Sequence, residues 1–265
     1  MIVIQDSSAN YSATAQYVTP PVANGLQLLS FLNTSAAQCA KNYARNGCGP
    51  NGIVTSVTPP VYDSTGVTFP GTLTDYLQTG LQDSVELTLI GIANVPTYTT
   101  GRRSFILSNF GGTTLATSGL NGFSRGLYVD NYTSSIMVPG YDRSYVTAAT
   151  PSASVELIAS TSGISNGYGS TPYCLIGTIS ASDGVRQIQN MTLGTSGTAT
   201  NNTNTIDMSS PYRAGSAVGG GTGGFGSPVR INAIMAYNRR LSTTERTTIY
   251  TWLKTLMSSL YGVTI

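Results

Sequence analysis

The sequence predicts an all-β protein, an antiparallel β-sandwich with one amphipathic helix at its C-terminal end and a shorter helix near its N-terminus. Its 30 glycines and many Ser, Thr and Asn residues are typical of short strands joined by tight turns. From residue 67 onward, short apolar segments recur between clusters of Gly, Pro, Asn and Ser. Residues 242–260 differ, because their apolar residues repeat at the spacing of a helix.

The strand pattern is clearest in Ser84–Ile92. There Val85, Leu87 and Leu89 occupy every second position, so one face of the strand is consistently apolar. Further segments with strand character are 67–71, 73–77, 104–109, 122–130, 135–138, 154–160, 173–180, 185–193 and 229–237. Strands at this spacing, separated by turn residues, indicate a sandwich or a barrel.

The C-terminal segment carries both a helix start signal and an apolar face. Ser242 and Glu245 have the spacing of a capping box, in which each side chain bonds the backbone N–H of the other residue, and they predict a helix over 243–260. On this helix, one apolar stripe is formed by Ile249, Trp252, Leu253, Leu256 and Leu260. We expect this stripe to pack on the sandwich, so Trp252→Ala should cost about 3–5 kcal/mol if the indole is fully buried.

Residues 1–60 have a different texture from the rest of the chain. The pairs Pro20-Pro21 and Pro59-Pro60 favour extended backbone, and Thr34–Arg45 is the one stretch between them that predicts a short helix. We therefore interpret residues 1–60 as an N-terminal arm that serves as an attachment segment. The sandwich, with its C-terminal helix, is predicted to span residues 61–265.

Composition excludes several classes of function. Charged residues make up 9% of the chain and the net charge is +2, without a basic run, so no nucleic-acid partner is expected. No apolar stretch is long enough to cross a bilayer, and residues 1–10 lack the features of a signal peptide. The chain contains no histidine, which excludes Ser-His-Asp and Cys-His catalysis and histidine-ligated zinc.

Cysteines and aspartates define no redox or metal site. Cys39 and Cys48 are close enough in sequence to pair, but without a secretion signal reduced thiols are expected for both of them and for Cys174. No cofactor is expected. Calcium binding is left open, because the candidate ligands are scattered along the chain and are expected to bond the backbone of turns instead. These candidates are Asp63, Asp75, Asp130, Asp142, Asp183 and Asp207.

Three segments resemble laminin-G-like, concanavalin A-like jelly-roll domains. VTFPGTLTDYLQTG (Val67–Gly80), followed by SVELTLIGI, is similar to the opening of such domains, and TISASDGVRQIQNMTLG (Thr178–Gly194) is similar to their central hairpin. The most specific match is a Gly-rich turn, a strand, YNRRLSTTE (Tyr237–Glu245) and a helix that ends in Tyr-Gly. The resemblance covers residues 60–263 and implies a binding module, often for glycans, of a kind also found in bacteriophage and viral surface proteins.

The resemblance also bears on catalysis. Related sandwich glucanases carry E-x-D-x-E on one strand, and this chain has no such run; Glu86, Glu156 and Glu245 are isolated. The chain is therefore predicted not to be an enzyme. Convergence of distant carboxylates keeps a polysaccharide hydrolase as the third alternative.

Candidate binding residues lie in segments that combine aromatic rings with planar polar groups. Rings can cover the apolar face of a sugar while guanidinium and carboxylate groups bond its hydroxyls. The alternative is that these residues pack at strand edges or at subunit contacts, where Tyr and Arg are also enriched. The candidates are Tyr98, Arg102, Tyr141, Asp142, Arg143, Tyr168, Tyr212 and Arg213.

We expect a non-enzymatic protein of a virion surface, either a structural or decoration subunit or the tip of a tail fibre. Its expected partners are other virion proteins, further copies of itself in a homo-oligomer and a host surface glycan. A free lectin-like domain in an extracellular setting is the alternative.

Overall fold

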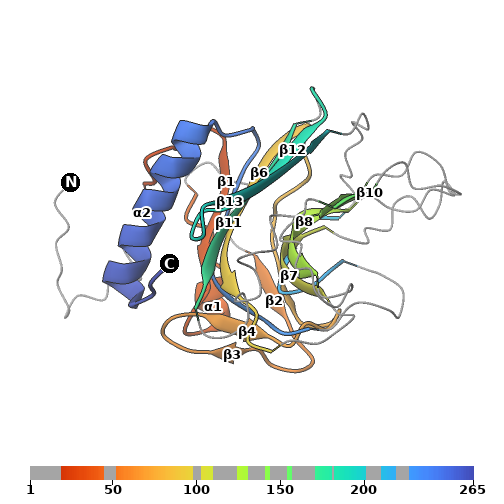
Figure 1. Ribbon diagram of the computed structural model, residues 1–265. Helices are drawn as coiled ribbons and strands as arrows, with labels where there is room; N and C mark the ends of the chain where they lie inside the picture. Colours follow the sequence, from red (N-terminus) through yellow and green to blue (C-terminus); the bar gives the residue numbers. More distant parts are fainter. Residues whose placement is uncertain are drawn as a thin grey trace, which may run out of the picture.

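The computed structural model describes residues 19–44, 52–97, 103–109, 124–130, 141–143, 154–156, 171–180, 182–200, 210–218 and 227–265. It confirms the predicted β-sandwich with a C-terminal helix. Two antiparallel sheets face each other, and helix α2 (Thr243–Tyr261) lies on the outer side of one of them (Figure 1).

The sheet beneath α2 is here called the helix-side sheet. Among the described residues it has eight strands, in the order β13-β12-β11-β6-β15-β4-β3, with β1 also paired to β15. Two nine-residue strands, β6 (Glu86–Asn94) and β15 (Val229–Tyr237), form its centre. The others are β1 (Leu26–Phe31), β3 (Val61–Tyr62), β4 (Val67–Phe69), β11 (Tyr173–Ser180), β12 (Val185–Asn190) and β13 (Thr195–Thr200).

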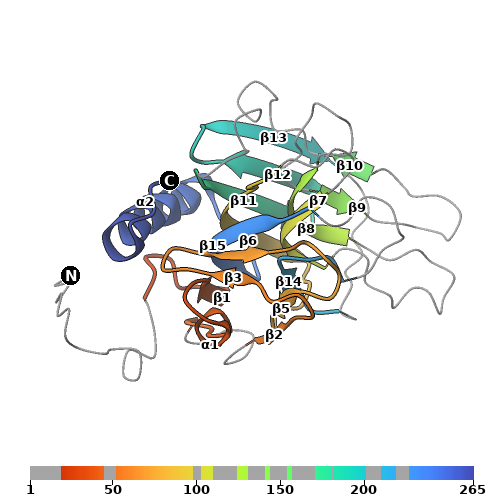
Figure 2. The same ribbon diagram turned by 90° about the horizontal axis from the view of Figure 1, so that it is seen from below.

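The second sheet, here called the opposite sheet, lies on the far side of the helix-side sheet from α2 (Figure 2). Its seven strands in the described part of the chain run in the order β10-β9-β8-β7-β14-β5-β2. They are β2 (Ile53–Thr55), β5 (Tyr76–Gln78), β7 (Arg103–Ser108), β8 (Ser124–Asp130), β9 (Tyr141–Arg143), β10 (Ser154–Glu156) and β14 (Arg213–Ala214).

Strand β6 is buried on both faces, which corrects the alternation that the sequence predicted. Leu87 and Leu89 belong to the core between the two sheets, whereas Ile90 and Ile92 belong to a second core beneath α2. Helix α2 covers this second face of the strand, so apolar residues occupy it as well. Val85 precedes β6 and is 50% exposed, so it does not extend the apolar face.

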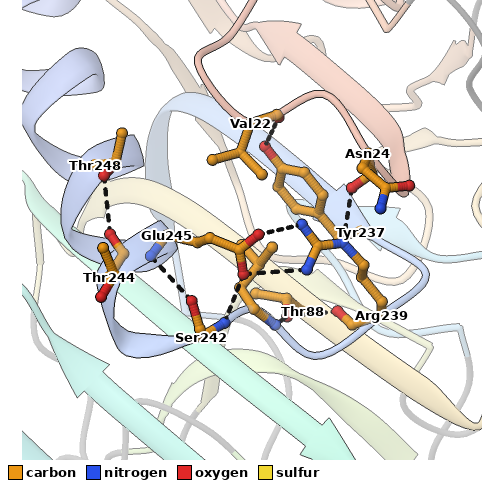
Figure 3. Close-up of polar contacts among 10 residues, drawn as sticks. Val22, Asn24, Thr88, Tyr237, Arg239, Ser242, Thr244, Glu245 and Thr248 are labelled. Carbon is orange, nitrogen blue, oxygen red and sulfur yellow. Dashed lines mark hydrogen bonds and ion pairs between the residues drawn. The ribbon is translucent and has the colours of Figure 1, made fainter.

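Helix α2 begins and ends as its sequence signals indicate. The capping box is present: Ser242 N–H donates to Glu245 Oε2 at 2.8 Å, and Glu245 N–H donates to Ser242 Oγ at 3.3 Å (Figure 3). Gly262 ends the helix in the left-handed conformation, with φ 64°. Arg239 pairs with Glu245 through its two terminal nitrogens, Nη1 and Nη2, and donates from Nε to Asn24 O at 2.8 Å. These bonds tie the start of the helix to the segment before β1.

The buried face of α2 is rotated from the predicted stripe. Its fully buried residues are Arg246, Ile249, Leu253 and Met257. Trp252 and Leu256 are half-buried at the flank, and Leu260 is 52% exposed. Trp252 therefore contributes less than a fully buried indole would, which lowers the expected cost of its truncation.

The sandwich does not begin at residue 61, which corrects the predicted domain boundary. Strand β1 pairs with β15 along Leu26–Phe31, and β2 forms the edge of the opposite sheet. Phe31 stacks on Tyr261 with the ring centroids 5.4 Å apart, so this segment belongs to the core beneath α2. The predicted helix over 34–45 is a single turn, α1 (Ala36–Cys39), with Ser35 as its N-cap.

Cys39 and Cys174 are free, buried thiols, and burial raises the pKa of each to about 12, so neither is reactive. Cys48 lies outside the described residues. No helix in the described ranges has enough continuous apolar length to span a bilayer.

Candidate binding face on the opposite sheet

The predicted binding residues fall into three groups. Tyr98, Arg102 and Tyr168 lie outside the described residues. Residues 141–143 form strand β9, of which the backbone is described. Tyr212 and Arg213 are described fully and have different environments.

Tyr212 is a core residue, which corrects its prediction as a ligand contact. Its side chain is fully buried among the apolar residues between the sheets. Its hydroxyl donates to Asp83 Oδ1 at 3.2 Å, and its backbone carbonyl accepts from Thr79 N–H at 3.0 Å. The ring therefore anchors β14 and is not available to a solvent-borne ligand.

Arg213 lies on the other face of the sheet and is held in a fixed plane. Its guanidinium carbon lies 3.8 Å from the centroid of the Tyr76 ring. Nε donates to Gln78 Oε1 at 3.1 Å, and Nη1 donates to the carbonyls of Ala217 and Val218 at 3.2 and 3.1 Å. Partial burial lowers the pKa of the Arg213 guanidinium, which remains charged at neutral pH.

Two local features of the sequence produce this arrangement. Gly215, with φ 86°, turns the chain directly after β14, and a Cβ there would lie 2.2 Å from the Phe69 ring. This turn brings the two acceptor carbonyls back to Arg213. The amide of Gln78 is oriented by donation from Nε2 to Pro211 O and Tyr212 O at 3.1 and 3.3 Å, so Oε1 is left for Arg213.

Strand register extends the face around Arg213. Directly paired residues of an antiparallel sheet share a face, and Arg213 pairs with Gln78, which pairs with Ile53. Thr55 and Tyr76 form the adjacent pair. We call these five residues the Arg213 strip: Ile53, Thr55, Tyr76, Gln78 and Arg213.

The strip is accessible on one side and bounded on the other. Ile53 is 69% exposed, Thr55 is exposed, and its three other members are half-buried. Beyond Arg213, the side chains of Phe105 on β7 and Tyr128 on β8 are buried and form a ring pair with centroids 5.2 Å apart. The strip is thus a partly exposed polar and aromatic surface at the β2 edge of the sheet.

Register also relates the strip to the predicted residue Tyr141. The row that contains Arg213 continues through Ser108 on β7 and Gly126 on β8 to position 141 on β9. Tyr76 and Gln78 were not predicted as binding residues, because the segment that contains them, Val67–Gly80, was used only to predict the fold. The signal that could have found them is their alternation with Leu77, which is in the core.

The described carboxylates serve structural roles. Asp63 Oδ1 accepts from Arg230 Nη2 at 2.7 Å and from two turn N–H groups, which hold the pKa of Asp63 well below its usual range. Glu86 accepts from Ser180 and Ser182, and Asp183 pairs with Arg240. Among the described residues, no three acidic or cysteine side chains are grouped as metal ligands.

Asp75 holds the turn beside the strip. Burial raises its pKa, but donation from Thr72 Oγ1 and from the N–H groups of Thr58 and Val57 outweighs this effect, and the pKa of Asp75 is lowered overall. Its ionised carboxylate therefore joins the turn after β2 to the start of β5.

No family model matches the sequence, and no curated protein matches it. Solved structures are similar in fold. One is Trypanosoma rangeli sialidase in complex with 2,3-difluorosialic acid as a covalent intermediate, with TM-score 0.55 and 15% identity over 90% of this chain and 34% of the sialidase. Another is the binding domain of botulinum neurotoxin serotype D, with TM-score 0.56 and 8% identity over 87% of this chain and 51% of that domain.

The same neurotoxin domain was also solved in complex with N-acetylneuraminic acid, and that structure matches with TM-score 0.57 and 8% identity. This chain spans about a third of the sialidase and about half of the neurotoxin domain. At these identities the likeness shows a shared β-sandwich architecture. It assigns no site.

Proposed function

We propose that the protein is a non-enzymatic, lectin-like carbohydrate-binding module and that the Arg213 strip is its ligand face. The observation that carries the proposal is the guanidinium of Arg213, stacked on Tyr76 and held by Gln78, on the sheet face that α2 does not cover. A ring beside planar donors and acceptors is the chemistry by which proteins contact the apolar face and the hydroxyls of a saccharide.

Two further observations support binding rather than catalysis. Asp63, Asp183 and Glu245 are each paired with an arginine, and Asp75 is held by a turn, so these carboxylates have structural partners. The sequence has no histidine that could serve as a general acid or base. The similar solved structures include one bound to N-acetylneuraminic acid, which fits a saccharide ligand.

A glycan array tests the proposal. We expect the intact protein to bind a subset of glycans and Tyr76→Ala to lose that binding, because the ring and the support for Arg213 are both removed. Tyr250→Ala on α2 is the matched control and should bind like the parent. Absence of any bound glycan, or unchanged binding by a folded Tyr76→Ala protein, would contradict the proposal.

Within this proposal, the module is displayed on a virion surface, as a bacteriophage structural, decoration or fibre-tip subunit that self-associates. The low charge supports this setting, as does the resemblance to laminin-G-like domains, a kind that also occurs in phage surface proteins. We expect portal, capsid or tail genes beside the gene of this chain and expect labelled antibody to decorate intact particles. Secretion genes as neighbours would favour a free extracellular lectin, and release of reducing ends from a polysaccharide would favour a hydrolase.

A further inference from the structure

The guanidinium of Arg213 has donors left over after its internal contacts are made. A guanidinium carries five N–H groups. Nε uses one on Gln78, and Nη1 donates to the carbonyls of Ala217 and Val218. Within the described part of the chain Nη2 donates no hydrogen bond, and it is not among the buried unsatisfied atoms, so it contacts solvent.

The environment of the Arg213 charge also differs from that of other described surface arginines. Arg230, Arg239 and Arg240 each lie within 2.9 Å of a carboxylate oxygen. Arg213 has no carboxylate partner among the described residues; its contacts are a ring, an amide oxygen and two carbonyls. A half-buried cation whose partners are all neutral is stabilised by an anion that reaches its open edge.

A comparison with Arg246 shows why Arg213 and not every unpaired arginine is a candidate. Arg246 also lacks a carboxylate partner in the described structure, but it lies on the buried face of α2 and is 4% exposed. Its Nη1 and Nη2 groups donate to Gln187 Oε1 at 2.7 Å and Thr243 Oγ1 at 2.9 Å. Its terminal nitrogens are therefore used internally, and helix packing closes the site to a ligand.

We infer that the Arg213 strip selects acidic saccharides, with the ligand carboxylate bound by the Nη2 edge of Arg213. This inference rests on the proposed function and adds the class of ligand to it. Gln78 is the positioning residue, because its amide fixes the guanidinium plane. The carboxylate belongs either to a sialic acid or to a uronic acid, which share this chemistry.

Calorimetric titration with two matched pairs of probes tests the inference: 3′-sialyllactose against lactose, and trigalacturonate against its methyl ester. We expect at least one acidic probe to bind about tenfold or more tightly than its neutral partner, since hydrogen bonds to charged groups contribute strongly. The pair that shows this difference identifies the source of the carboxylate.

Variants locate the effect. Arg213→Gln should reduce the acidic affinity to the neutral level, and Arg213→Lys should fall between, because it keeps the charge and loses the planar fork. Arg240→Gln removes the same charge at the Asp183 pair and should leave both affinities within about twofold of the parent. Chemical-denaturation curves establish that each variant is folded.

The outcomes separate the two proposals. Equal affinity for acidic and neutral probes, with binding lost in Tyr76→Ala, overturns the acidic selectivity and leaves the carbohydrate module standing. An acidic preference that persists in folded Arg213→Gln also overturns the inference. Failure of these probes and of every arrayed glycan to bind overturns both.

Discussion

The outer faces of the two sheets differ in how far they are buried. On the helix-side sheet, Ile90 and Ile92 meet Ile249 and Leu253 of α2, so this outer face has become a second core. On the opposite sheet, the Arg213 strip remains half-open and presents a ring, an amide and a guanidinium. Burial beneath α2 stabilises the fold on one side of the sandwich, whereas on the other side the Arg213 strip stays partly accessible to solvent.

Among the variants that test this comparison, Leu253→Ala should have the largest effect on stability. Leu253 is fully buried beneath α2, so truncation should lower the free energy of unfolding by about 2–5 kcal/mol. Urea denaturation measures this change. Leu260→Ala is the control on the same helix, because Leu260 is 52% exposed and should change stability by less than about 0.5 kcal/mol. Equal effects of both changes would show that α2 does not pack as described.

Trp252→Ala should have a smaller effect than Leu253→Ala. The indole is half-buried at the flank of the helix, so we expect a loss of about 1–3 kcal/mol. Thermal and urea unfolding of the two variants side by side gives the order. A larger loss of unfolding free energy for Trp252→Ala than for Leu253→Ala would indicate that Trp252 lies on the buried face of the helix, as the sequence predicted.

Glu245→Gln should cost about 1 kcal/mol at neutral pH, because it weakens the Arg239 pair and the capping box. The hydrogen bonds from Arg239 and Ser242 lower the pKa of Glu245 from 4.5 to about 2. Its stabilisation is therefore complete above pH 4.5 and is lost as the pH falls toward 2. The difference in unfolding free energy between parent and variant should narrow between pH 5 and pH 2, whereas a pH-independent difference would contradict this account.

The parts of the fold that the sequence predicts are those with local signals. Ser242 and Glu245 are three residues apart, and the helix that they start runs from 243 to 261. The Arg213 strip depends instead on the pairing of Arg213 with Gln78, which are 135 residues apart in the sequence. Such a register is set by tertiary packing. The sequence alone therefore indicates neither that Tyr76 and Gln78 lie beside Arg213 nor that the ring of Tyr212 lies in the core.

The N-terminal region shows the same limit. LQLLSF (Leu26–Phe31) is apolar enough for a central strand, but it lies between a Pro-Pro pair and a short helical stretch. Only its pairing with β15, about 200 residues later, reveals that it belongs to the sandwich. Residues 1–60 are thus partly core, and a deletion of residues 1–58 would remove β1 and β2.

Arg213→Gln should have a smaller effect on stability than the changes at Leu253, Trp252 and Glu245. Its contacts are half-exposed and neutral, so the free energy of unfolding should change by less than about 1 kcal/mol. Urea denaturation checks this value. A loss as large as that of Leu253→Ala would mean that the strip serves the fold rather than a ligand.

The most direct test of the central claim is backbone amide NMR during titration with a glycan that the array identifies. The account predicts that the largest shift changes fall on residues 53–55, 76–78 and 213–214 and that residues 243–261 of α2 stay unchanged. Saturable changes confined to α2 or to residues away from the strip would contradict the assignment of the opposite sheet as the binding face.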